Sequence, residues 1–410
     1  MRITMRLTLE DPGKKLKKQS LWNLGLVFLY IVTYFIDGIT RYKNALPLLM
    51  LITAIIYLVR NKKIIRVFFN KIMLMIILLC ISMLYSLIFS TDIKISWDAM
   101  KGDMLTKGFL LSSLLIPIVL FYETKERIIK LVIISFISAL SMRMAIEGYI
   151  YFLGYQHGII PFESTRYRNV SDALVFLFPG LIPLWHNKRV DIKAIFILLT
   201  MVFCILCLGT LARGAWLATI IMGLIWLIAY REWKLITLSL LLTFAGFIAI
   251  QNIQPQYTTK LLNKIHQTDS SARYRNGTQG TALELIMEKP VVGYGYGKNI
   301  FHNIYNERVK DHPNWIFKHS IGPHNIYLDI WFGCGVIGLM AFLGVIIVVL
   351  TTLIKSISRT TDPDKMTYLM LTVSFFGFYI IRGMFELVDI KPLGILIGLL
   401  LIMRYKNQKN

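Results

Sequence analysis

Runs of apolar residues, each about as long as a membrane-spanning helix, recur along almost the whole chain. A helix needs about 20 consecutive apolar residues to cross the hydrocarbon core of a bilayer. Hydrophobic residues make up 56% of the 410 residues, more than in a typical soluble domain. The sequence therefore predicts an all-α integral membrane protein with about twelve transmembrane helices. The segments expected to form them are 21–39, 45–59, 72–90, 106–122, 129–152, 173–186, 194–211, 214–230, 234–251, 325–354, 367–384 and 386–403.

Basic residues give the chain a formal net charge of +22 and are distributed unevenly. They gather in every second connection between the apolar segments and near both ends of the chain, for example at 14–18, 60–66 and 404–409. This alternation is the positive-inside pattern, which puts both termini in the cytoplasm and predicts an even number of helices. We therefore interpret these residues as topological anchors and not as a nucleic-acid-binding surface.

One long polar segment interrupts the apolar pattern late in the chain. It divides the sequence into helices 1–9 at residues 1–251, a large external loop at 252–323, and helices 10–12 with a cytoplasmic tail at 324–410. The loop is rich in basic residues, and long loops are exempt from the positive-inside count. A phosphate-bearing partner would explain this excess, and so would a solvated loop beside anionic lipid headgroups.

A short helix is expected inside the external loop. Thr281-Ala-Leu-Glu284 has the spacing of a capping box, and apolar residues follow it as far as Pro290. We therefore expect a helix that starts near Thr281 and ends at Pro290.

Arg213 lies between two apolar runs, in the tight external turn Gly209-Thr-Leu-Ala-Arg-Gly214. A guanidinium at the membrane edge can simply extend to the lipid headgroups. It is also suited to the bidentate binding of a diphosphate, and the positive-inside rule disfavours arginine on this side. We therefore expect Arg213 to bind an anionic part of a substrate.

His324 and Asn325 follow Gly322-Pro323, at the start of the next apolar segment. A histidine in this position can cap a helix. Alternatively, a neutral imidazole can take a proton from a sugar hydroxyl. The other histidines of the external loop lack the spacing of zinc ligands and have no accompanying cysteines, so we expect no metal site. They are His266, His302, His312 and His319.

Three short patterns match known motifs only as strings of letters. Cys204 and Cys207 have CxxC spacing inside an apolar run, where we expect them to pack against helices or lipid. Gly333-Cys-Gly-Val-Ile-Gly338 fits a dinucleotide-binding pattern but continues into a membrane segment, so we expect its glycines to let helices approach closely. Asp362-Pro-Asp364 lies on the cytoplasmic side and is interpreted as a turn. None of the three predicts a cofactor.

Arg143 and Glu147 lie four residues apart within the fifth predicted helix, so they share one face of it. Charged residues inside membrane segments commonly serve function. Such a pair can equally hold two helices together, and the sequence leaves both interpretations open.

These motifs resemble those of the O-antigen ligases of Gram-negative bacteria, which belong to a superfamily that includes O-antigen polymerases and protein O-oligosaccharyltransferases. The architecture is similar over essentially the whole chain. The arginine that precedes a helix in this family matches Arg213, and its loop arginine matches Arg275, upstream of Pro290-Val-Val-Gly-Tyr-Gly295. Its His-Asn pair matches His324-Asn325, with Gly335-Val-Ile-Gly338 in the following helix.

Two family positions are assigned less sharply. Arg273 competes with Arg275 for the loop position, and an arginine before the sixth helix corresponds to Arg166 or Arg168. Asn276-Gly-Thr-Gln-Gly280 replaces the aromatic or apolar residues usual after the loop arginine, which leaves the start of the following helix open.

The resemblance implies a multi-pass protein of the Gram-negative inner membrane, with the large loop and the active site facing the periplasm. The donor would be a polysaccharide linked to undecaprenyl diphosphate, and the acceptor a sugar hydroxyl of the lipid A–core oligosaccharide of lipopolysaccharide. No metal or other cofactor would be needed. Arg213 and Arg275 would contact the diphosphate, and His324 would act as general base. The residues implied to bind substrate are Arg273, Asn325 and Arg168.

Two other functions remain as alternatives. An O-antigen polymerase would use the same donor with a second carrier-linked glycan, but polymerases often divide their polar surface between two sizeable loops, whereas here 251–323 dominates over 153–172. A flippase for lipid-linked oligosaccharides would favour internal repeats and charges along a central cavity. We therefore favour the ligase.

Overall fold

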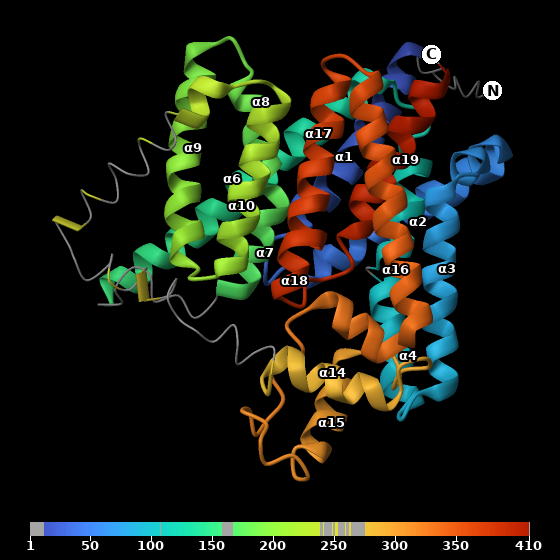
Figure 1. Ribbon diagram of the computed structural model, residues 1–410. Coiled ribbons are helices and arrows are strands. Elements are labelled where there is room, and N and C mark those ends of the chain that lie inside the picture. Colours follow the sequence, from blue (N-terminus) through green and yellow to red (C-terminus); the bar gives the residue numbers. More distant parts are fainter. Residues whose placement is uncertain are drawn as a thin grey trace, which may run out of the picture.

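The computed structural model describes residues 12–106, 108–157, 167–237 and 275–409, together with isolated residues between 238 and 274. Within these ranges every regular element is a helix (Figure 1). Seven helical stretches of the described chain, three of which join consecutive elements, are long and apolar enough to cross a membrane. The predicted class, an all-helical multi-pass membrane protein, is therefore confirmed, and the count of twelve spans stays a prediction.

The helices follow one another with short connections, and several are joined by 3-10 or π turns. The N-terminal elements are α1 (Pro12–Tyr34), α2 (Thr40–Arg60), η1 (Lys62–Phe68), α3 (Lys71–Ser86), η2 (Leu87–Phe89), α4 (Ile93–Lys101), η3 (Gly102–Thr106), α5 (Phe109–Val119) and α6 (Lys125–Gln156). The middle elements are α7 (Tyr167–Leu177), η4 (Phe178–Leu181), α8 (Ile182–Trp185), α9 (Val190–Gly209) and α10 (Arg213–Ala229). The C-terminal elements are α14 (Thr278–Glu288), α15 (Lys298–Arg308), α16 (Ile326–Arg359), α17 (Asp364–Phe375), η5 (Phe376–Arg382), α18 (Gly383–Phe385) and α19 (Leu393–Lys409).

Each predicted segment except 234–251 coincides with a described helix or with a run of consecutive helices. The segment 234–251 lies mostly outside the described residues. Residues 91–105, left between the predicted segments 72–90 and 106–122 as a connecting loop, are instead largely helical. They form α4 and η3, and the Asp92 side chain accepts a hydrogen bond from the Ile95 backbone at the start of α4 (2.9 Å). A carboxylate in this position satisfies an otherwise unpaired amide of the first turn.

The last helix begins later than predicted, at Leu393 instead of residue 386. Pro392 disfavours helical backbone at the residue before it. In addition, the side chain of Asp389 accepts a hydrogen bond from the backbone of Lys391 (3.0 Å), which stabilises a turn. Residues 386–392 therefore form a loop, called the 386–392 loop below.

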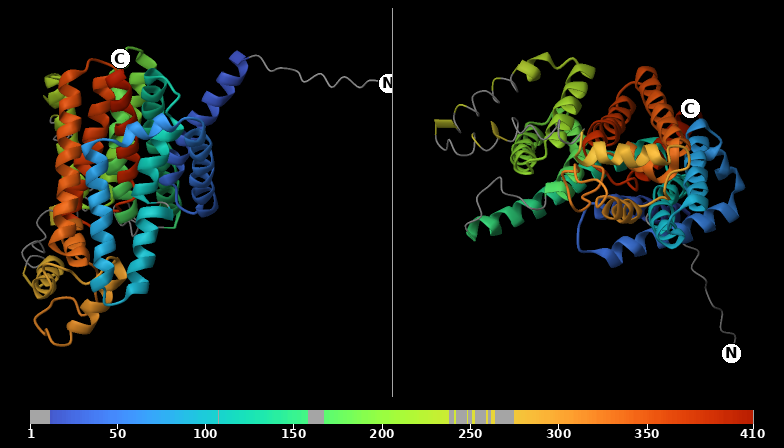
Figure 2. Two further views of the ribbon diagram at one scale, coloured as in Figure 1. Left: turned by 90° about the vertical axis from the view of Figure 1, so that its right-hand side faces the viewer. Right: turned by 60° about the horizontal axis from the view of Figure 1, so that its bottom comes forward.

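The two ends of the helical bundle carry different parts of the chain. The first turns of α1 and the end of α19 lie at one end, and α14 and α15 lie at the other (Figures 1 and 2). The helices α14 and α15 pack on the first turns of α16 around their own apolar core, which includes Leu285, Phe301, Trp315 and Phe332.

Helix α14 starts earlier than the capping-box spacing predicted. Its N-cap is Gly277, so Thr281 lies within the first turn, where its hydroxyl donates to the carbonyl of Gly277 (2.7 Å). The capping box is therefore wrong. The helix ends at Glu288, shortly before Pro290, because proline cannot continue it.

The loop at residues 290–297 is joined to α16 by main-chain hydrogen bonds. The backbone of Tyr294 donates to the carbonyl of Phe332 (2.8 Å), and that of Val336 donates to the carbonyl of Pro290 (2.9 Å). Between them α16 is kinked at Gly335, whose φ of +64° favours glycine. A side chain at Gly335 would also overlap the carbonyl of Val291. The expectation that this glycine lets a second helix approach is therefore wrong, because it admits a loop.

Candidate functional site

His324 lies where the polar segment enters α16. Its backbone is in the left-handed region, with φ of +48°, which is uncommon for a residue other than glycine. The next residue, Asn325, is the N-cap of α16, and its side-chain oxygen accepts hydrogen bonds from the backbones of Tyr327 (2.9 Å) and Leu328 (3.2 Å). Asn325 therefore caps the helix, and the His324 side chain is not used as a cap.

The imidazole of His324 is paired with a carboxylate from the 386–392 loop. Nδ1 of His324 lies 2.6 Å from Oε2 of Glu386, and the two side chains are only 3% and 13% exposed. A carboxylate that holds Nδ1 fixes the ring orientation and favours the tautomer with the acceptor at Nε2. Sequence reasoning missed Glu386 because it placed this residue at the start of a helix.

Gln279 of α14 ties three elements together at this point. Its side-chain nitrogen donates to the backbone carbonyls of His324 (3.3 Å) and Met384 (3.1 Å). The amide nitrogen of Asn325 donates to the same Met384 carbonyl (3.3 Å). Gln279 belongs to the segment that departs from the family pattern in sequence, and its contacts show what that segment does here. It holds the backbone of the histidine.

Arg213 begins α10 and is half-buried. A Cβ built on its neighbour, Gly214, would lie 2.8 Å from Cβ of Phe385 and 3.2 Å from Nη1 of Arg382. Phe385 immediately precedes Glu386, so the start of α10 lies at the same corner as the His324–Glu386 pair. Backbone amides at a helix N-terminus and a guanidinium both favour anions.

The structure describes less of the other arginines that the sequence singled out. Arg275 is exposed, four residues before Gln279, and its neighbour Asn276 accepts a hydrogen bond from the backbone of Ile316 (3.0 Å). Arg273 and Arg166 lie outside the described residues, and of Arg168 only the helical backbone is described. The structure thus brings His324, Asn325 and the start of α10 together, and Arg275 lies four residues before Gln279, which contacts the His324 backbone.

Arg382 is a second residue that sequence reasoning missed. It is buried in η5, where Nε donates to Asp172 (2.9 Å) and Nη2 donates to the hydroxyl of Ser171 (2.8 Å). These bonds connect α7 to η5, which the short helix α18 joins to the 386–392 loop. An arginine inside the apolar run 367–384 was the signal available in the sequence.

Comparisons with known proteins agree on one family. A family model described as O-antigen ligase matches residues 196–343, which include Arg213, Arg275 and His324. Over 407 residues the chain is 44% identical to a protein of Salmonella typhimurium named O-antigen ligase, with 98% of this chain and 99% of that protein covered. The chain belongs to the O-antigen ligase family.

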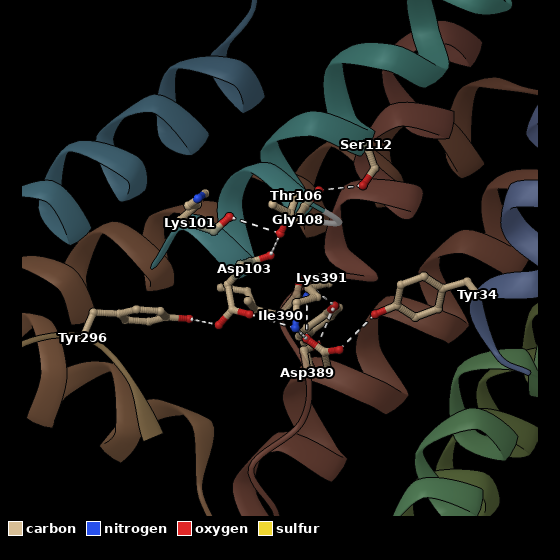
Figure 3. A network of polar contacts seen from close by, with 12 residues as sticks. Tyr34, Lys101, Asp103, Thr106, Gly108, Ser112, Tyr296, Asp389, Ile390 and Lys391 are labelled. Atoms are coloured by element: carbon tan, nitrogen blue, oxygen red, sulfur yellow. Dashed lines mark hydrogen bonds and ion pairs between the residues drawn. The ribbon is translucent and has the colours of Figure 1, made fainter. Parts of the chain in front are cut away.

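In this family member, a network of polar contacts holds the 386–392 loop (Figure 3). Nζ of Lys391 lies 2.9 Å from Oδ1 of Asp103, and the hydroxyl of Tyr296 donates to the other oxygen of Asp103 (2.7 Å). On the opposite side, the hydroxyl of Tyr34 donates to Asp389 (2.9 Å). Burial lowers the pKa of Lys391, but Asp389 and Asp103 raise it more, so this pKa lies above its usual value. The ammonium therefore stays charged at neutral pH.

A cavity of about 530 Å³ adjoins the network and is lined by the 386–392 loop and by carboxylates from four helices, one of which is Asp98 of α4. Asp103 of η3, Asp172 of α7 and Asp329 of α16 line it, together with Leu387 and Lys391. In the part of the chain that the structure describes, no three histidine, cysteine or acidic side chains converge to hold a metal ion.

Two histidines of the external loop are used in packing, because His302 contacts the Ser320 hydroxyl and His312 stacks on Trp315.

Proposed function

We propose that this protein transfers a polysaccharide from undecaprenyl diphosphate to a sugar hydroxyl of lipid A–core, at the periplasmic side of the Gram-negative inner membrane. The name of the Salmonella relative supports a transferase-type enzyme of this class. The observation that carries the proposal is the buried His324–Glu386 pair beside the arginine-bearing start of α10.

His324 acts as the general base in this proposal. The acceptor hydroxyl attacks the anomeric carbon of the donor sugar, and the bond from that carbon to the diphosphate oxygen breaks. The hydroxyl proton moves to Nε2 of His324, and undecaprenyl diphosphate leaves with the bonding electrons. Glu386, at Nδ1, stabilises the imidazolium that forms.

The arginines bind the diphosphate in this scheme. Arg213 combines its guanidinium with the positive end of the α10 helix dipole, and Arg275 precedes α14 by three residues. Loss of one such donor is expected to reduce the rate by roughly 10²–10³-fold. Arg273 stays the alternative to Arg275, and Arg168 stays a proposed substrate contact.

Asn325 is assigned a different task from the predicted one. Its oxygen is used in the helix cap and its nitrogen donates to Met384. We therefore propose that Asn325 positions His324 and does not bind substrate itself.

The orientation in the membrane is part of the proposal. The start of α1 and the end of α19 lie at one end of the bundle and α14 and α15 at the other, which supports cytoplasmic termini and a periplasmic site (Figure 2). Since the leaving group is already a diphosphate, the transfer requires no metal.

The decisive experiment is transfer by purified protein in nanodiscs, with an undecaprenyl-diphosphate glycan as donor and EDTA present. Lipid A–core and a second carrier-linked glycan are offered separately as acceptors. Product on lipid A–core is the expected result. Lengthening of the carrier-linked glycan would instead identify a polymerase, and no transfer to either acceptor would favour a transporter.

His324→Ala tests the assignment of the base. Transfer should fall by at least about 10²-fold, as for loss of a general base. His319→Ala, which changes an exposed histidine of the same loop, is the matched control. Equal activity of the two variants would overturn the assignment.

A further inference from the structure

Arg143 is a buried arginine whose donors are only partly used. The residue is 1% exposed within α6, and Nη1 donates to the carbonyl of Phe35 (3.1 Å) and to Asp37 (2.8 Å). Nε and Nη2 have no hydrogen-bond partner among the described residues, although Nη2 lies 3.8 Å from Oε2 of Glu147. A buried donor left unsatisfied costs about 1–3 kcal/mol. Among the described residues, these two donors thus find no hydrogen-bond acceptor.

Arg143 lines a cavity of about 300 Å³, which is at the lower end of the usual size of small-molecule pockets. The cavity is lined by α1, the α1–α2 connection, α2, α6, α7, η5 and the 386–392 loop. Its charged lining is balanced, with three cations and three carboxylates. These are Lys43, Arg143 and Lys391, and Asp37, Asp172 and Asp389.

This lining favours an uncharged, polyhydroxylated ligand. A diphosphate would meet three carboxylates, whereas a sugar hydroxyl can accept from Arg143 and donate to an aspartate in charge-assisted hydrogen bonds. Tyr30, Tyr34 and Phe378 add aromatic surface, against which the apolar face of a pyranose ring can pack. We propose that this cavity binds one sugar residue of a saccharide substrate, with Arg143 as a binding residue.

The cavity adjoins the proposed active site. Asp172, Asp389 and Lys391 line both this cavity and the larger one of about 530 Å³. The larger cavity is also lined by Leu387, the residue after Glu386. The two cavities therefore share part of their polar lining, and Leu387 and Ile326 bring the larger one within two residues of Glu386 and His324 along the chain. The inference rests on the proposed function, because it takes the substrates to be saccharides.

Direct binding distinguishes the two sources of the sugar. The full-length protein in detergent is titrated by calorimetry with two lipid-free, dephosphorylated oligosaccharides, the core oligosaccharide and the repeat unit of the donor polysaccharide. One of them should bind, and Arg143→Met should weaken its binding at least tenfold. Arg189→Met, at an exposed arginine paired with Asp191 ahead of α9, should leave binding unchanged.

A second variant tests the cavity without removing a charge. Thr33 is half-buried on the cavity wall, so Thr33→Phe fills the space while Arg143 and Glu147 stay in place. It should weaken the same oligosaccharide at least tenfold. A Thr33→Phe protein that folds and binds like the wild type overturns the proposal, whatever Arg143→Met does.

The outcome also separates this proposal from the proposed function. Wild-type protein that transfers glycan but binds neither oligosaccharide would overturn the sugar site alone. Wild-type protein that binds one oligosaccharide in this cavity but transfers to neither acceptor would overturn the proposed function and leave the sugar site standing.

Discussion

Two arginines of this protein are each 1% exposed, but the hydrogen-bond partners of their guanidinium groups differ. Arg382, in η5, donates from Nε to Asp172 and from Nη2 to Ser171. Arg143, in α6, leaves the same two nitrogens without a hydrogen-bond partner among the described residues. In a membrane protein a buried charge is expensive. An arginine whose Nε and Nη2 both donate to a second helix holds the helices together, whereas one in which both nitrogens lack an acceptor is suited to a ligand.

The two regions meet at Asp172. This aspartate binds Arg382 and also lines the cavity that contains Arg143. The arginine that connects the helices therefore also sets the position of a carboxylate in the sugar cavity.

The largest effect on stability is expected for Arg382→Leu. Removing one partner of a buried pair leaves the other charge unsatisfied, which costs about 3–5 kcal/mol. Thermal unfolding in detergent measures the loss. The control is Arg189→Leu, whose ion pair with Asp191 is exposed and should contribute less than about 1 kcal/mol. Equal losses in the two variants would show that Arg382 does not connect the helices as described.

Glu386→Gln tests the catalytic role of the carboxylate that follows Arg382 by four residues and contacts His324. The amide can still accept a hydrogen bond from Nδ1 of His324 but carries no charge. The kcat should therefore fall by roughly 10–100-fold, and the KM for the glycan donor should stay unchanged. Steady-state transfer kinetics separate the two constants. Glu307→Gln, on the exposed face of α15, is the matched control. A raised KM with an unchanged kcat would mean that Glu386 binds substrate.

A double variant sharpens the interpretation of Arg143. Replacing a buried ion pair by apolar residues of similar size is often nearly neutral. The free energy of unfolding of the Arg143→Met, Glu147→Met double variant should therefore lie within about 1–2 kcal/mol of the wild-type value. Its oligosaccharide binding should nevertheless stay at least tenfold weaker. Recovery of binding together with stability would show that the pair is only structural.

The smallest effect concerns Lys391, beside both cavities. Its pKa is raised in the folded protein by Asp389 and Asp103, so its stabilising contribution is fully present below the unfolded pKa of about 10.5 and is lost as pH rises through the folded value. The difference in melting temperature between wild type and Lys391→Met should therefore be constant from pH 6 to about pH 9 and shrink above about pH 10.5. A difference that shrinks between pH 6 and 8 would contradict this assignment.

Much of the fold follows from the sequence because apolar segment length and basic-residue alternation are local signals. They predicted the helical membrane class, the tight turn before Arg213 and the start of a helix after His324-Asn325. The helices α4 and η3 were missed because a polar stretch between apolar runs suggests a loop even where Asp92 starts a helix.

The chemistry around the predicted site was less accessible. Glu386 is 62 residues from its partner His324, and Arg382 is 210 residues from Asp172, so neither pair leaves a spacing that a single sequence reveals. The end of the preceding helix and the turn before Pro392 determine where Glu386 lies. The sequence pointed to His324 as a base but contained no local signal for the carboxylate that holds it.

The main-chain joint between the 290–297 loop and the kinked α16 has a mechanical consequence. Hydrogen bonds on both sides of Gly335 link the loop to the helix that His324-Asn325 begins, so a tilt of this part of α16 carries the histidine and the loop together. The loop and this part of the helix therefore move as one unit. In the proposed transfer, entry of the two lipid-linked substrates would therefore be accommodated by contacts that side chains alone maintain.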